Sequence, residues 1–310
     1  MRHPLAALAL LLGLSAAPAF AEAPKVVVSI KPLHSLVASV MQGVGEPTLL
    51  VRGGASAHDY ALKPSDAKAL RDADVVFWIG EALESFLVKP LGTLSKKTQT
   101  VELMNAAGLT LLEVRKGGAW EAHEHGRKHS HEHAGAEHGD INAHIWLDPA
   151  NAKEMAETAA VALAARDQAN AATYKANAEA LGKRLDALDV ELKADLAPVA
   201  ERRFVVFHDA YQYFEQRYGL NAAGSIIVSP DRPPSAKRLA LIRDRIKDLG
   251  AACVFAEPEF EPKLVDTVVE GTKARKGVLD PEGAAIPEGP ELYFTLLRNL
   301  AKGLTECLGA

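Results

Sequence analysis

The sequence predicts an α/β fold with two lobes, each built on a parallel β-sheet, joined by one long helix. Apolar runs of strand length alternate with helical patterns in both halves of the chain, which is typical of parallel sheets covered by helices. Between residues 168 and 197, apolar residues spaced by three and four predict a helix of about 40 Å that connects these halves. The chain has 310 residues, which is enough for two lobes.

The first 21 residues are expected to be a cleaved signal peptide. Arg2 and His3 precede an apolar run, Leu5–Leu14, which is too short to span a bilayer. The residues AFA at 19–21 include the small side chains that signal peptidase requires, so the mature chain is expected to begin near Glu22. A retained membrane anchor is the alternative. No cysteine lies near the cleavage site, so the sequence does not indicate a lipid anchor.

Residues 22–167 are expected to form the first lobe. Its predicted strands are Lys25–Ile30, Thr48–Val51, Asp74–Ile79 and Thr100–Leu103, with Leu109–Val114 as a further strand or an extended edge. Its predicted helices begin at Pro32, after Ser65 as the N-cap, near Glu84 and at Pro149 after the N-cap Asp148. The connecting helix is then expected at 168–197, ended by Pro198.

Residues 198–310 are expected to form the second lobe, in which the alternation resumes. The predicted strands are Arg203–Phe207, Ala223–Val228, Ala252–Ala256 and Lys276–Leu279. The predicted helices are Ala210–Tyr218, a helix from the N-cap Ser235 to Leu249, Pro262–Gly271 and Tyr293–Leu308.

A segment rich in histidine and acidic residues, 121–140, interrupts the first lobe. It has no apolar periodicity and contains several glycines, so we interpret it as a mobile loop. Neutral imidazole is the commonest metal ligand, so the loop is expected to bind further zinc ions weakly; a solvated polar linker is the alternative. The candidate ligands are His123, His125, His129, His131, His133 and His138.

Four other residues are expected to converge on the cleft between the lobes. His58 lies in the loop after a strand, and His144 lies just before a helix. His208 and Asp280 stand at the carboxyl ends of predicted strands, where open α/β sheets bind ligands. Three imidazoles and one carboxylate would make a tetrahedral zinc site. A turn with Pro281 and Gly283 is the competing role for Asp280.

Three further residues near strand ends receive structural roles. His34 is interpreted as a structural residue at a helix start, where its side chain can form a hydrogen bond. Glu257 and Glu259 are expected to be strand-end acids that fix the wall of the cleft.

The charge argues against nucleic-acid binding, and the cysteine count indicates a disulfide. The net charge is −5 and there is no basic patch of the kind that binds nucleic acid. The two cysteines, Cys253 and Cys307, are expected to form a disulfide if the chain is exported, because an even count in an oxidising compartment favours pairing. Two buried free thiols are the alternative.

The chain resembles the cluster A-I metal-binding proteins that serve high-affinity zinc ABC importers. The matching pieces are GASAHDYALKPSD, NAHIWLDP, FVVFHDAYQYFE, CVFAEPEF and VLDPEG, spread over nearly all of the expected mature chain. The resemblance implies two Rossmann-like lobes bridged by a rigid helix, with His58, His144 and His208 as metal ligands. Manganese and iron relatives tend to place a carboxylate where His208 stands, so histidine favours zinc. The loop before His58 carries no acid, which leaves Asp280 or water as the fourth ligand.

The expected function is therefore zinc capture in the periplasm. By this resemblance, a monomeric chain delivers Zn²⁺ to the membrane permease of an ABC importer, which works with a cytoplasmic ATPase. A manganese- or iron-type protein of the same family is one alternative, and an exported zinc buffer or adhesin is another. An exported zinc hydrolase is disfavoured, because no HExxH motif occurs and a site closed by four protein ligands leaves no open metal position.

Overall fold

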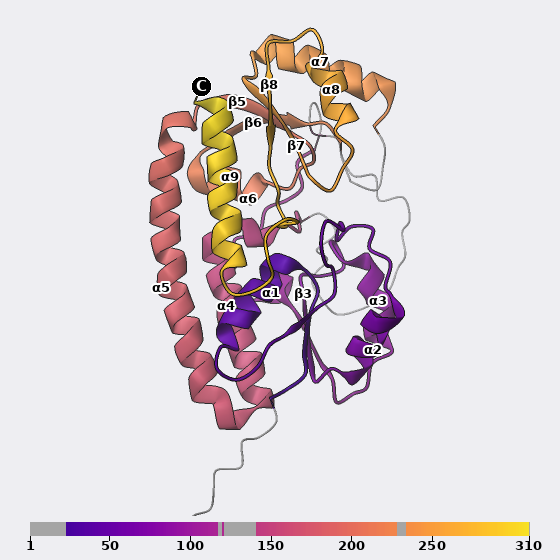
Figure 1. Cartoon of the computed structure of the whole chain (residues 1–310), viewed down its shortest axis with the longest axis vertical. Coiled ribbons are helices and arrows are strands. Elements are labelled where there is room, and N and C mark those ends of the chain that lie inside the picture. Colours follow the sequence, from indigo (N-terminus) through magenta and orange to yellow (C-terminus); the bar gives the residue numbers. More distant parts are fainter. Residues whose placement is uncertain (1–22, 117–119, 121–140, 228–233, 310) are drawn as a thin grey trace, which may run out of the picture.

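The computed structural model describes residues 23–116, 120, 141–227 and 234–309. The expected signal peptide, residues 1–21, and the six candidate ligands of the segment 121–140 lie outside them. Within the described residues, two four-stranded parallel sheets with flanking helices confirm the predicted α/β class. Figure 1 shows one sheet in each half of the elongated molecule.

The first sheet has the strand order β2-β1-β3-β4, and every neighbouring pair is parallel. The strands are β1 (Val26–Val28), β2 (Thr48–Leu49), β3 (Val75–Trp78) and β4 (Gln99–Glu102). The central strands β1 and β3 are uninterrupted apolar runs because helices cover the sheet on both faces. The helices of this half are α1 (Lys31–Val40), α2 (Pro64–Asp72) and α3 (Ser85–Gly92).

The second sheet repeats the pattern in the order β6-β5-β7-β8, again parallel throughout. Its strands are β5 (Arg203–Val206), β6 (Asn221–Ser225), β7 (Cys253–Ala256) and β8 (Arg275–Val278). Its helices are α6 (Gln212–Tyr218), α7 (Ala236–Leu249) and α8 (Lys263–Val269). Ser235 caps α7 as predicted, since its side chain accepts from the backbone N–H of Arg238.

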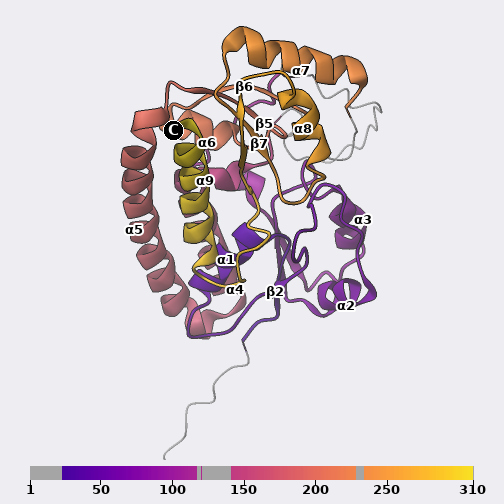
Figure 2. The same ribbon diagram turned by 45° about the horizontal axis from the view of Figure 1, so that its top comes forward.

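A long helix connects the two halves. Helix α5 (Ala171–Leu196) has 26 residues and runs beside α4 (Pro149–Arg166) and α9 (Leu292–Leu308) along one side of the molecule in both views (Figures 1 and 2). The predicted stripe is its buried face: Tyr174, Ala178, Leu181, Leu185, Leu188, Leu192 and Leu196. Short 3₁₀ turns extend both ends, so Pro198 lies within the turn Ala197–Val199, two residues past the end of α5.

Two local predictions were wrong. Helix α2 begins at Pro64 and not after Ser65, because proline has the φ angle of a first helical residue and the Asp66 carboxylate accepts from the backbone N–H of Lys63. The segment 109–114, predicted as a further strand or an extended edge, forms no regular strand and makes one isolated antiparallel bridge, between Glu113 and Ile141. The N-cap Asp148 is as predicted, with its side chain accepting from the backbone of Ala150.

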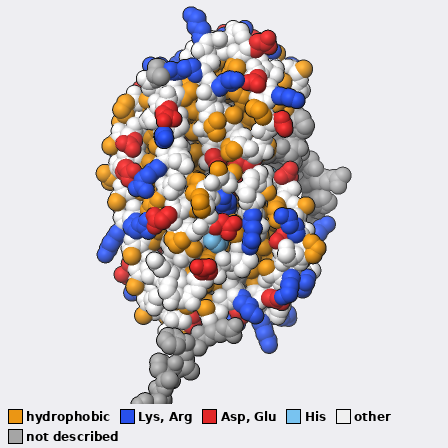
Figure 3. All heavy atoms as spheres, viewed as in Figure 1, with side chains coloured by type: hydrophobic (Ala, Val, Ile, Leu, Met, Phe, Trp, Pro, Cys, Tyr) orange, Lys and Arg blue, Asp and Glu red, His pale blue; other side chains and the backbone are white. Residues whose placement is uncertain are grey.

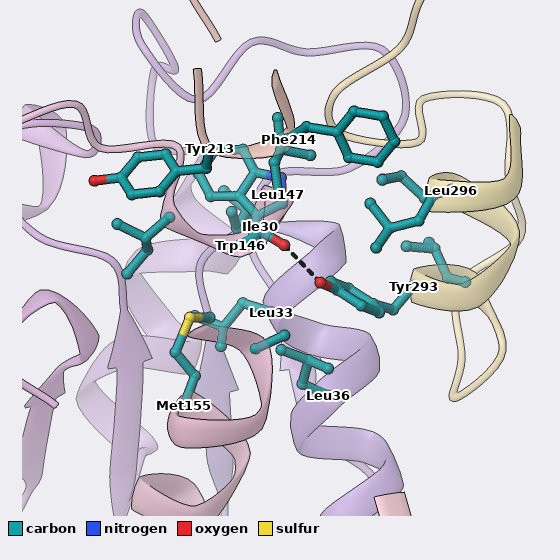
Figure 4. Packing of buried hydrophobic residues seen from close by; sticks show 14 of the residues in the cluster. Ile30, Leu33, Leu36, Trp146, Leu147, Met155, Tyr213, Phe214, Tyr293 and Leu296 are labelled. Atoms are coloured by element: carbon teal, nitrogen blue, oxygen red, sulfur yellow. Dashed lines mark hydrogen bonds between the residues drawn. The ribbon is translucent and has the colours of Figure 1, made fainter. Parts of the chain in front are cut away.

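The main core draws residues from both halves of the chain. Figure 4 shows Trp146 and Leu147 packed with Ile30 of the first half and with Tyr293 of α9, whose hydroxyl donates to the carbonyl of Trp146 at 2.6 Å. Helix α9 packs on α1 and α5 as well as on β8 of its own sheet. The expected lobe boundaries at 167 and 197 remain predictions.

A disulfide ties α9 to the second sheet. Cys253 of β7 and Cys307 of α9 are bonded, as predicted, with a sequence separation of 54 and a Cα–Cα distance of 6.2 Å. In the chain-entropy model, closing a loop of this length stabilises the folded state by about 4 kcal/mol. The bridge holds the C-terminal helix on the strand that leads to Glu257.

Candidate metal centre

Three histidines, remote in the sequence, come together between the two sheets. His58 lies in the loop between β2 and α2, His144 immediately precedes the 3₁₀ turn at Ile145–Leu147, and His208 lies two residues after β5. The Nε2 atom of His144 lies 3.2 Å from that of His58 and 3.2 Å from that of His208. In the described part of the chain, these three form the group whose ligand atoms all lie within 4.8 Å of one another.

The spacing of the nitrogens fits a metal ion. Two nitrogens bound at 2.0–2.1 Å to a tetrahedral ion stand about 3.3–3.4 Å apart. The two Nε2–Nε2 separations of 3.2 Å are close to that value. The three rings also lie at angles to one another, with centroids 5.1 to 5.6 Å apart, so the contact is not a stack. The arrangement can supply three imidazole nitrogens to one cation.

Neighbouring side chains contact the Nδ1 atoms of two of the imidazoles. The Nδ1 atom of His144 lies 2.7 Å from the Asn142 side-chain oxygen, and the Nδ1 atom of His208 lies 2.6 Å from Glu257 Oε2. Ligating histidines commonly bond a carboxylate or amide oxygen in this way, which fixes the ring direction. The sequence predicted only that Glu257 lines the wall of the cleft. In the structure, Glu257 also contacts the His208 imidazole directly.

Burial keeps the imidazole of His208 neutral. The side chain is 5% exposed, and this desolvation lowers the pKa of His208 to about 4. Its contact with Glu257 is therefore a hydrogen bond and not an ion pair at neutral pH. A neutral imidazole keeps a lone pair for a metal, so the ligand needs no deprotonation before binding.

Asp280 lies in the turn after β8 and is not among the described residues whose ligand atoms all come within 4.8 Å of one another. Its Oδ1 atom accepts from the backbone N–H groups of Glu282, at 3.1 Å, and Gly283, at 2.6 Å. This is the turn-forming role that the sequence offered as the alternative, and Gly283 adopts the positive φ of 76° that such a turn requires. The second oxygen, Oδ2, takes no part in these bonds. Ligation by Asp280 remains a prediction.

Buried acids surround Asp280. Burial, and secondarily the charge of Asp280, raises the pKa of Glu259 to about 9. Burial likewise raises the pKa of Glu282 to about 8 and that of Glu257 well above its usual range. Both oxygens of Glu259 are buried, and neither has a hydrogen-bond partner among the described residues. A divalent cation held nearby would favour the ionised form of each acid.

The turn after β8 is held by groups from the first half of the chain. The ammonium of Lys31 donates to the carbonyls of Gly283, Ala284 and Ile286 at 2.5 to 3.0 Å. The indole N–H of Trp146 donates to the carbonyl of Pro281 at 2.8 Å, and the backbone N–H of Ala57 lies 3.4 Å from Glu282 Oε1. Ala57 and Trp146 lie one and two residues from His58 and His144.

An ion-pair cluster fastens the two halves beside His208. The guanidinium of Arg115 bonds both carboxylate oxygens of Asp209, the residue after His208, and pairs with Glu215 at 2.6 Å. It also lies 3.4 Å from the ring centroid of Trp120. Glu215 is 6% exposed, so this pair is largely desolvated.

Sequence reasoning missed Asn142, Arg115 and Lys31 at this site. For Asn142 a signal was present, because it stands two residues before His144 in the quoted motif NAHIWLDP. Arg115 and Lys31 act on residues about 100 and 250 positions away, which no local pattern reveals. His34 is structural as predicted: it is buried, and its Nε2 donates to the carbonyl of Pro47 at 3.0 Å.

On the face drawn in Figure 3, lysine and arginine are interspersed with aspartate and glutamate, and neither sign forms a continuous patch. A search of the described helices finds none with the length and apolar character to cross a membrane.

Comparison with known proteins points to one family. Residues 26–307 match the family ZnuA, described as zinc-uptake complex component A, periplasmic. The chain is 51% identical over 304 residues to the high-affinity zinc uptake system protein ZnuA of Brucella abortus, covering 91% of each chain. Among solved structures it superposes on a crystal structure of ZnuA with a TM-score of 0.75 at 27% identity, covering 92% of this chain and 99% of that one.

A second structural neighbour carries a different name. The laminin-binding protein Lmb of Streptococcus agalactiae, described as bifunctional with adhesin and metal-transporting activity, has a TM-score of 0.73 at 25% identity. The alignment covers 91% of this chain and 99% of that one. The family match spans nearly the whole described chain, including all three histidines. The chain therefore belongs to the family of periplasmic A components of zinc-uptake complexes.

Proposed function

We propose that this protein captures Zn²⁺ in the periplasm and delivers it to the membrane permease of an ABC importer powered by a cytoplasmic ATPase. The supporting observation is the convergence of three imidazole Nε2 atoms from the two halves of the chain. Zinc is the transported ion in this function and no bond of a substrate is changed, so the protein needs no catalytic group. We further propose that residues 1–21 are removed on export and that the mature chain acts as a monomer.

We propose His58, His144 and His208 as the three nitrogen ligands, with Asp280 Oδ2 as the fourth. A set of three imidazoles and one carboxylate closes a tetrahedral zinc site. Three neutral nitrogens with one oxygen suit Zn²⁺ better than Mn²⁺, which prefers oxygen-rich octahedral sites. Water in the fourth position is the alternative to Asp280.

The transport role is tested by growth under zinc limitation. A strain lacking this chain should grow poorly in chelated medium, and added Zn²⁺ should restore growth. The wild-type chain should complement the defect, whereas a His208→Ala chain should not. Normal growth of the deletion strain in chelated medium, with zinc uptake unchanged, would favour the exported buffer or adhesin. Restoration by Mn²⁺ in place of Zn²⁺ would favour a manganese-type protein.

Deletion of residues 121–140 should lower the number of bound zinc ions but leave the tightest site in place. The segment holds six histidines, so its imidazoles offer further ligands, whereas the proposed primary ligands lie outside it. Imidazole has a reference pKa near 6.5 and must be neutral to bind a metal, so these weaker sites should empty first as the pH falls through about 6. Titration calorimetry of the deletion variant against the full chain measures both effects. Loss of the tight site in the variant would place the segment in the primary coordination sphere.

A further inference from the structure

The side chain of Asn142 has one orientation, fixed by groups that can only donate or only accept. Its Nδ2 atom lies 2.9 Å from the carbonyl oxygen of Asp209, which can only accept. Nδ2 also lies 3.0 Å from Gln212 Oε1, and Gln212 is itself oriented because its Nε2 donates to the carbonyl of Glu113. The Asn142 Oδ1 atom accepts the backbone N–H of His144 at 3.1 Å. The amide oxygen therefore faces the His144 ring.

This orientation determines the tautomer of His144. An amide oxygen can only accept a hydrogen bond, and it lies 2.7 Å from His144 Nδ1. The proton of the neutral ring must therefore be on Nδ1. The Nε2 atom is left with its lone pair, and it is this atom that faces the other two histidines.

Glu257 orients His208 by the same logic. Its Oε1 atom accepts from the Tyr211 hydroxyl at 3.1 Å and faces the backbone N–H of His208 at 3.4 Å. These two donors leave Oε2 for His208 Nδ1, at 2.6 Å. When Glu257 is ionised, Oε2 can only accept, so the ring proton of His208 is on Nδ1 and the Nε2 lone pair faces the cluster.

We infer that Asn142 and Glu257 are positioning residues that hold His144 and His208 in the metal-binding tautomer before the ion arrives. This inference rests on the proposed zinc site, but it concerns the metal-free protein. Without these acceptors, each ring would divide between two tautomers, and one of them has a proton on the atom that must bind the metal. Asn142 also joins the halves of the site, since it bonds the main chain next to His208 while holding His144.

The tautomers are read by NMR of the metal-free full chain labelled with ¹⁵N-histidine, with His144→Gln and His208→Gln variants used for assignment. In the wild type, both rings should carry the proton on Nδ1. In Glu257→Gln, the donors at Oε1 hold the amide oxygen, so the NH₂ group faces His208 Nδ1 and moves the ring proton to Nε2. Zinc affinity should then fall by roughly 10- to 100-fold, as for loss of an outer-sphere partner.

Matched variants separate this role from simple packing. Tyr211→Phe removes a hydrogen bond from the same carboxylate but keeps the acceptor, so the His208 tautomer should stay on Nδ1. At the other ring, both Asn142→Asp and Asn142→Leu lose the two hydrogen bonds that Nδ2 donates, but only the aspartate keeps an acceptor for His144 Nδ1. Asn142→Asp should therefore keep the His144 tautomer, whereas Asn142→Leu should give a mixture with weaker zinc binding. If Glu257→Gln does not fold, the comparison of Asn142→Asp with Asn142→Leu tests the same inference at His144.

Three results would overturn the inference: an Nε2 proton on either ring in the wild type, an unchanged His208 tautomer in Glu257→Gln, or identical tautomers and affinities in the two Asn142 variants. The expected tautomers in a wild-type chain that binds no zinc would instead overturn the proposed function, because the NMR measurement needs no metal.

Discussion

Replacing His208 by alanine is expected to weaken zinc binding by more than 100-fold. Loss of an outer-sphere partner costs roughly 10- to 100-fold in metal affinity, and loss of a ligand should exceed that. The remaining nitrogens, from His58 and His144, leave a zinc ion undercoordinated. The measurement is a chelator competition in a chain that also lacks residues 121–140, so that the imidazoles of that segment cannot replace the missing ligand.

Asp280→Asn in the same background tests the proposed fourth ligand. Asparagine keeps an oxygen that can accept from the N–H groups of Glu282 and Gly283, so the turn should persist while the charge is lost. If Asp280 ligates the ion, zinc affinity should fall, but less than for His208→Ala. An unchanged affinity would assign the fourth position to water. Wild-type affinity in His208→Ala would show that the three-histidine site is wrong.

The sequence predicted that His58, His144 and His208 meet, but not how they are held. His208 could be placed because parallel strands present their carboxyl ends at one edge, where ligands bind. The partner of its Nδ1 atom, Glu257, lies 49 residues away at the end of the neighbouring strand β7. This contact forms because β5 and β7 are neighbours in the sheet. No periodicity along the chain predicts which strands are neighbours. The acid could be assigned to the cleft wall, but not to the imidazole.

Replacing Arg115 by methionine is expected to destabilise the protein by about 3 kcal/mol, the lower end for breaking a buried pair by removing one partner. Methionine keeps the apolar stem but leaves Asp209 and the buried Glu215 without their cation. For a chain of this size the midpoint of thermal unfolding should fall by roughly 5–10 °C. Zinc affinity should fall less than in His208→Ala, because all ligands remain.

Arg298→Met is the control for this effect. Arg298 pairs with Glu191 at 2.7 Å through two nitrogens, as closely as Arg115 pairs with Glu215, but both partners are largely exposed. Exposed pairs contribute about 0–1 kcal/mol, so the midpoint should change little. Equal shifts in the two variants would mean that the Arg115 cluster does not hold the two halves together.

The fold was more predictable from the sequence than these ion pairs and hydrogen bonds between distant residues. Periodicity identified α5, because a helix that packs along its length on one side needs the stripe that begins at Tyr174. It failed at 109–114, where the apolar residues pack against the core but the backbone makes only one bridge. The carbonyl contacts of Lys31 with the turn after β8 arise from the packing of distant segments, so the isolated sequence gives no sign of them.

The most direct test of the account is a competition between Zn²⁺ and Mn²⁺ for the metal-free protein, with the metal content of the purified chain measured alongside. Three imidazole nitrogens with at most one carboxylate predict one tightly bound Zn²⁺ per chain and much weaker Mn²⁺. Tighter binding of Mn²⁺, or the absence of a tight Zn²⁺ site, would contradict the assignment of this site to zinc capture.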